Sequence, residues 1–185
     1  MRILLPLFCL VLFLNGCFSS SGPTDNAGFD KIETLKELEG VYQNLGEGEQ
    51  GESPVYLSEV IWPKTAGIPH ALITTIEVRL LSPNSLGVRA KSRVRVEKED
   101  TFVEGTDFEI HSGRIRLKHR VGSGGDINPV LYGPYYERHE LGLDTKGHGK
   151  LRRLDGFVGL LMVTPIAGVT SEAVRFVKID NVPHP

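Results

Sequence analysis

The chain has 185 residues, 40% of them hydrophobic, and a formal net charge of -2. This length suits one domain with a core of its own, and the balanced charge excludes the basic excess typical of nucleic-acid-binding proteins. The charge is unevenly spread, because residues 17–62 hold nine acidic and two basic residues, whereas residues 79–120 hold ten basic and six acidic ones. Such asymmetry concerns surface partners, or neutralisation between two regions of the folded domain, and not the fold itself.

The first 16 residues have the pattern of a secretory signal. Met1 and Arg2 give a positive start, and Ile3–Leu14 is almost unbroken in its apolar character. The run is too short to span a bilayer, which takes roughly 20 apolar residues. We therefore expect a cleaved signal peptide over residues 1–16.

The end of this segment, Leu14-Asn15-Gly16-Cys17, resembles the lipobox of bacterial lipoproteins. In that family the cysteine thiol receives a diacylglycerol and the signal is cut before it. The resemblance implies that Cys17 is the lipidated first residue and that palmitate-type chains attach it to a membrane. Phe18 stands where lipoproteins retained in the inner membrane carry Asp, which implies the periplasmic face of the outer membrane, or the cell membrane if the source has only one. An ordinary signal followed by a chance cysteine is the alternative.

Residues 17–28 are rich in Ser, Gly, Asn and Pro, which predicts a flexible, lipidated tether. Cys9 leaves with the signal and Cys17 is capped by lipid, so no thiol remains for a disulfide or for a zinc site built on thiolates. The folded domain is then residues 29–185, and it depends on an apolar core.

Within this domain the spacing of Ile32, Leu35 and Leu38 predicts one short helix over residues 29–39, with Asp30 as its cap. The pattern then changes to alternation, which predicts half-buried antiparallel strands. These are a strand near Val41 and strands over residues 76–80, 86–99, 113–121, 135–143, 156–164 and 172–179. The inward residues include Ile76, Val78, Leu80, Val88, Ala90, Val94, Val96, Ile115, Leu117 and Val121. Turns are expected at residues 82–85, 104–107, 111–113 and 122–126.

About eight strands in series favour an all-β, antiparallel up-and-down meander that closes into a small barrel, because closure removes exposed edges. The segment "LEGVYQN" resembles the opening of lipocalin-like proteins, with Gly40 and Tyr42 in the places of the glycine and the aromatic residue. The resemblance implies that Tyr42 plugs the floor of a lipocalin-like barrel. Together with "SEVIW" and a closing "RF", this segment also resembles uncharacterised bacterial lipoproteins. Trp62 is expected to pack in the core, or else to contact a partner.

Two strands carry basic side chains on their outward positions. If these strands are neighbours, they form one basic face for an anionic envelope partner such as lipid head groups, glycan chains or an acidic protein. Alternatively Glu97, Glu99, Glu104 and Glu109 offset the charge internally. The basic face consists of Arg89, Lys91, Arg93, Arg95, Arg114, Arg116, Lys118 and Arg120.

Motifs for chemistry are weak. The glycines of "LGEGEQGE" match a dinucleotide loop. However, Pro54 follows where a helix should begin, and three glutamates in and after the loop would repel the phosphates. His139 lies in "ERHE", and the alternation of strand side chains predicts a surface or rim position rather than a base or ligand. No histidine pair has zinc-ligand spacing and no serine lies in a nucleophile elbow. We therefore expect no cofactor, no metal site, and no catalytic residue.

These observations predict a lipid-anchored, all-β binding module, either an envelope-assembly or maintenance partner or a carrier of an apolar ligand. The alternative is a hydrolase that acts on envelope glycans or lipids. A polar cluster facing the interior would favour the hydrolase, and an apolar interior would favour the binding module.

Overall fold

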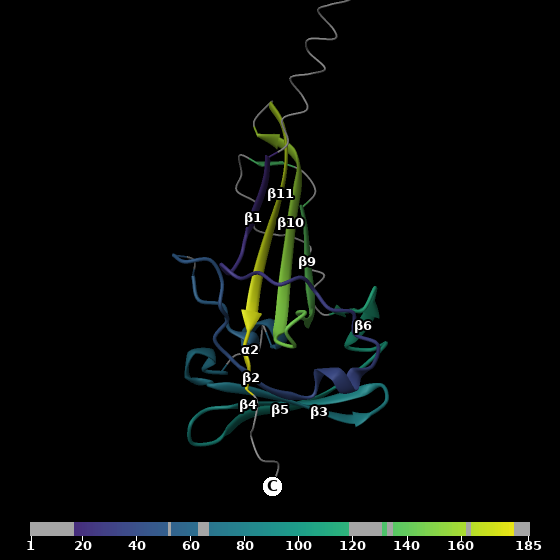
Figure 1. Ribbon diagram of the computed structural model, residues 1–185. Coiled ribbons are helices and arrows are strands. Elements are labelled where there is room, and N and C mark those ends of the chain that lie inside the picture. Colours follow the sequence, from purple (N-terminus) through teal and green to yellow (C-terminus); the bar gives the residue numbers. More distant parts are fainter. Residues whose placement is uncertain are drawn as a thin grey trace, which may run out of the picture.

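The computed structural model of the protein describes residues 17–51, 53–62, 67–118, 131–132, 135–161 and 164–179. The fold is all-β, as the sequence predicts, and its strands form two sheets. In Figure 1 a tall hairpin of two long strands rises from a flatter sheet at the base. The signal segment, residues 1–16, lies outside the described residues.

The larger, seven-stranded sheet has the order β1-β11-β10-β9-β7-β6, and β8 pairs with the end of β10. All its pairs are antiparallel except β1 with β11, which is parallel. Its strands are β1 (Cys17–Ser21), β6 (Phe108–His111), β7 (Arg114–Leu117), β8 (Leu131–Tyr132), β9 (Tyr135–Leu143), β10 (Gly149–Leu161) and β11 (Thr164–Phe176).

The smaller, five-stranded sheet has the order β12-β2-β3-β4-β5, with antiparallel pairs throughout. Only Val177 separates β11 from β12, so the end of the chain passes directly from the larger sheet to the smaller one. Its strands are β2 (Gly40–Gln43), β3 (Thr75–Ser82), β4 (Ser85–Lys91), β5 (Val96–Val103) and β12 (Lys178–Ile179).

The prediction of a lipocalin-like barrel of about eight strands is not confirmed, because the described residues form twelve strands in two sheets and no closed barrel. The chain leaves the smaller sheet after β5, at the predicted turn over residues 104–107. There Asp107 Oδ2 accepts a hydrogen bond from the Val103 amide at 2.8 Å, and Gly105 adopts a φ of 86°. This turn directs β6 to β7 of the larger sheet, so β5 stays an edge strand among the described residues.

The predicted helix over residues 29–39 is shortened to the 3-10 helix η1 (Leu35–Leu38). Thr34, and not Asp30, caps it: the Thr34 amide donates to Glu37 Oε1 at 2.7 Å. Asp30 instead joins the larger sheet, because its amide donates to the Leu143 carbonyl at 2.9 Å. Two further helices, α2 (Leu57–Ile61) and η2 (His70–Leu72), were not predicted.

The alternating stretch over residues 86–99 is two strands and not one. Val88 and Ala90 are buried on β4 as predicted, but Val94 is 87% exposed and Val96 47% exposed. The chain reverses between β4 and β5, since the Ser92 amide donates to the Arg95 carbonyl at 2.9 Å. The prediction that Val94 and Val96 face inward is therefore wrong.

The core lies between the two sheets and takes side chains from both. Ile76 of β3, Phe108 of β6 and Phe176 of β11 are all almost fully buried. Tyr42 is buried as well, and its hydroxyl donates to the Leu38 carbonyl at 2.8 Å. Trp62 packs near Phe102 as a core residue, as expected, and its indole nitrogen donates to Asp100 at 2.8 Å.

The segment predicted as a flexible tether, residues 17–28, is packed on the fold. Residues Cys17–Ser21 form β1 beside β11, and the Gly28 carbonyl accepts a hydrogen bond from the Thr145 amide at 3.0 Å. Without β1, the edge of β11 would leave a row of backbone groups unpaired. A Ser-rich segment can pair with them without bulky side chains.

Candidate functional site

An apolar cavity of about 100 Å³ lies between the two sheets. The described residues around it are almost all hydrophobic, and Lys150 is the charged one among them. Side chains from both sheets and from the helices line it: Leu38, Tyr42, Leu57, Ile61, Val78, Leu86, Val88, Phe102, Phe108, Ile115, Leu117, Leu141, Leu143 and Phe176, together with Lys150 and the backbone of Gly142 and Gly149.

A cluster of arginines lies on β7 and β10 around Glu140 of β9, whose side chain is 4% exposed. Arg114 Nη1 lies 2.8 Å from Glu140 Oε2, Arg116 Nη2 lies 3.3 Å from Oε1, and Arg152 also bonds to Oε2. Burial alone would raise the pKa of Glu140, but the three guanidinium groups outweigh it and lower that pKa to about 2. The carboxylate therefore stays ionised and fully engaged.

Phe29 joins this cluster to the N-terminal segment. The Arg114 guanidinium carbon lies 4.6 Å from the centre of the Phe29 ring, Lys150 Nζ 5.3 Å and the Arg152 guanidinium carbon 5.7 Å. Lys150 Nζ also donates to Asn26 Oδ1 and to the Ala27 carbonyl. Burial lowers the pKa of Lys150 from its ordinary value, while the Asp144 carboxylate opposes that shift. These contacts tie residues 26–29 to β10.

The proposed basic face is divided between the two sheets. Arg89 and Lys91 lie on β4, while Arg93 and Arg95 lie in the exposed turn that follows. Arg89 Nε bonds to Glu99 Oε1 at 2.7 Å, Arg95 Nε to Glu97 at 3.0 Å, and Lys91 to the buried Glu77. Internal offset by Glu97 and Glu99 is thus present in this half.

The other half lies on and after β7 in the larger sheet. Arg114 and Arg116 bind Glu140, and Lys118 Nζ donates to the Gly105 carbonyl. Arg120 lies outside the described residues. Because β4 and β7 belong to different sheets, the structure does not bring the eight cations onto one sheet face. Sequence reasoning also missed Glu140 and Arg152, which no local motif distinguishes.

His139 is buried, at 7% exposed, and not a surface or rim residue as predicted. His139 lies on the same face of β9 as Leu141 and Leu143, which line the cavity, so this face is turned toward the interior. In the part of the chain that the structure describes, no three His, Cys, Asp or Glu side chains gather in a way that would hold a metal ion.

Cys17, the predicted lipidation site, is the first residue of β1 and pairs with Gly168 of β11. Strand β1 runs along the hairpin above the five-stranded sheet (Figure 1). Among the described residues, no helix has both the length and the apolar character needed to cross a bilayer.

Comparison of the chain with protein-family models, with curated proteins and with solved structures finds no match in any of the three.

Proposed function

We propose that this chain is a lipoprotein anchored through Cys17 to the periplasmic face of a bacterial outer membrane, where it acts by binding an envelope component. The observation that carries the proposal is the lipobox-like Leu14-Asn15-Gly16-Cys17, followed at once by a strand of the folded domain. With β1 paired to β11, a lipid on Cys17 holds the domain close to the membrane and in one orientation.

The interior supports binding rather than hydrolysis. The cavity lining is hydrophobic. Glu140 is the buried carboxylate that comes closest to being a candidate catalytic group, and three arginines neutralise it. A general acid needs a raised pKa, whereas the pKa of Glu140 is lowered to about 2.

Of the two binding roles, the geometry favours an envelope-assembly or maintenance partner over a lipocalin-like carrier. The cavity volume of about 100 Å³ is well below the roughly 300 Å³ at which pockets for small organic ligands begin. The binding surface is then on the outside of the domain, and the exposed Arg93 and Arg95 are candidates for contact with an anionic partner.

The test of the anchor is Cys17→Ser. The variant should take up no labelled palmitate and should leave the membrane fraction, because the thiol that receives the diacylglycerol is gone and no single weak contact replaces acyl chains. Wild-type protein should fractionate with the outer membrane and yield its partner in a pull-down from detergent-solubilised envelopes. Palmitate in the variant, or a soluble wild type, would contradict the proposal.

A further inference from the structure

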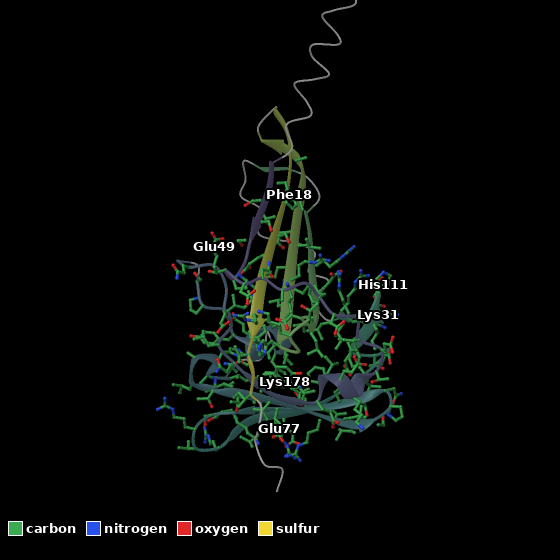
Figure 2. All side chains as sticks on the ribbon, in the orientation of Figure 1. Phe18, Lys31, Glu49, Glu77, His111 and Lys178 are labelled. Carbon is green, nitrogen blue, oxygen red and sulfur yellow. The ribbon has the colours of Figure 1, made fainter. Side chains whose placement is uncertain are left out.

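The register of the larger sheet places aromatic residues beside the anchor. Cys17 lies opposite Gly168, Gly168 pairs with Phe157, and Phe157 pairs with Tyr135. The adjacent row toward the body consists of Phe18, Val169, Gly156 and Tyr136. Phe18 is 73% exposed, and Figure 2 places it in the upper half of the hairpin, below the tip. Tyr and Trp are enriched at the level of the lipid head groups, and Tyr135 and Tyr136 lie in these two rows.

Charged side chains are absent from the half of the hairpin that lies beside and beyond Cys17. Residues 156–171 carry no charged side chain, and they are largely apolar. The first charged row is two steps from Cys17 toward the body, with Asp155 opposite Glu137. The half of the hairpin that packs on the body carries Lys150, Arg152, Arg153, Glu172 and Arg175. The other half, residues 156–171, thus lacks the charged side chains that are costly to place in lipid.

The uncharged end of the hairpin is longer than the head-group layer of a membrane is thick. The last pair of the hairpin, Leu161 with Thr164, is four steps beyond the Gly168 row, which corresponds to about 13 Å at roughly 3.3 Å per residue. The head-group layer on each side of a bilayer is about 5–8 Å thick. A hairpin that stands upright from the Cys17 row is therefore long enough to cross the head groups and to reach the outer part of the hydrocarbon.

We propose that this end of the hairpin, residues 157–161 of β10 and 164–168 of β11, enters the lipid bilayer beside the acyl chains on Cys17. The inference rests on the proposed lipidation of Cys17. The acyl chains and the end of the hairpin then both attach the domain to the membrane, with β10 and β11 standing upright on it. The depth is limited to the head groups and the outer part of the hydrocarbon, because among the described residues β1 covers the outer edge of β11 only from Gly168 onward, and unpaired backbone groups are costly in hydrocarbon.

The test uses the depth of a spin label on the lipidated full-length product. Cys9 and Cys17 are the two cysteines of the chain; the first leaves with the signal and the second is acylated, so an introduced cysteine is the one free thiol. Leu160→Cys carries a nitroxide in vesicles of phosphatidylethanolamine and phosphatidylglycerol. Val94→Cys, in the exposed turn of the smaller sheet, is the matched control.

We expect the ratio of collisions with oxygen, which partitions into lipid, to collisions with a water-soluble nickel chelate to be several-fold higher at position 160 than at position 94. Equal ratios would overturn the inference, and so would low access of both reagents at position 160, which would mean that protein covers the hairpin. Ile166→Cys provides a second reading if Leu160→Cys does not fold. Mass spectrometry of Cys17 comes first: an unmodified thiol refutes the anchor itself, whereas an acylated Cys17 with a wet position 160 refutes only the insertion.

Discussion

Glu140 shows how one buried carboxylate can organise the middle of a sheet. Its oxygens are held by Arg114, Arg116 and Arg152 from the two flanking strands. Removing one partner of a buried ion pair leaves the others uncompensated, which is more costly than the pair itself is favourable. Here three cations depend on a single anion, and Phe29 covers two of them.

We expect Glu140→Gln to lower the free energy of unfolding at neutral pH by about 2 to 3 kcal/mol, the equivalent of a pKa shift of this size. The pKa of Glu140 is lowered to about 2 in the folded state, so its contribution is complete above the unfolded pKa of roughly 4.3 and is lost as the pH falls toward 2. The difference between variant and wild type should therefore shrink over that range in urea unfolding.

The matched control is Glu99→Gln, which removes a pair with Arg89 at the surface. The Glu99 side chain is 51% exposed, so its loss should change the free energy of unfolding by at most about 1 kcal/mol. A Glu140→Gln chain as stable as the wild type at neutral pH would show that the arginine cluster does not stabilise the sheet.

Close packing accounts for Gly46, the first glycine of the segment that resembles a nucleotide loop. A Cβ on Gly46 would lie 2.8 Å from Phe176 Cε1 and 3.1 Å from the Val55 carbonyl, and closer still to Val174. We expect Gly46→Ala to destabilise the fold by roughly 1 to 3 kcal/mol through overpacking. Gly48→Ala, whose nearest neighbour lies 4.0 Å away, should stay within about 0.5 kcal/mol. Equal melting temperatures for the two variants would contradict this explanation.

At the scale of elements, the basic side chains of the turn between β4 and β5 differ in exposure from those of β7. Arg93 and Arg95 protrude from this turn, and the Arg95 side chain is 73% exposed. Arg116 lies on β7, and its side chain is only 25% exposed because it bonds to Glu140. The same residue type thus has two different environments in the two sheets.

We expect the double variant Arg93→Ser, Arg95→Ser to keep the wild-type melting temperature and to lose capture of an anionic envelope partner, with capture by the wild type weakening as salt rises. Arg116→Ser should lower the free energy of unfolding by about 1 to 3 kcal/mol, because it leaves Glu140 under-bonded. Partner capture and thermal melts of both variants measure the two effects. Full capture by the double variant would show that Arg93 and Arg95 are solvated side chains that do not contact the partner.

At the scale of the whole molecule, the two sheets share one core around the cavity. Val88 of β4 borders the cavity and is 5% exposed, facing side chains from the larger sheet. We expect Val88→Ile to fill part of the space and to stabilise the fold by up to about 0.8 kcal/mol, the value of one buried methylene group. A rise in melting temperature, measured by calorimetry, checks this, and a fall would show that the space cannot accept a methylene group.

Local features of the chain were predictable from the sequence alone. Alternation identified β9 over residues 135–143 with its observed bounds, and placed Ile76, Val88 and Ile115 in the core, because successive strand residues point to opposite faces. The turns over residues 82–85 and 111–113 follow from the conformational preferences of Pro, Asn, Ser and Gly. The lipobox-like segment is likewise local, because it concerns four consecutive residues.

Only the tertiary structure decided which strands pair and what they cover. Alternation continues through Val94, but a turn at Ser92 makes two strands of this stretch, because a second pairing with β4 satisfies more backbone groups than one long strand would. Likewise Glu140 is buried because β7 and β10 bring it arginines from 26 positions before and 12 positions after it in the chain. The sequence thus determined local conformation and the candidate anchor, whereas long-range pairing, which depends on the burial achieved by the whole chain, determined two sheets in place of a barrel.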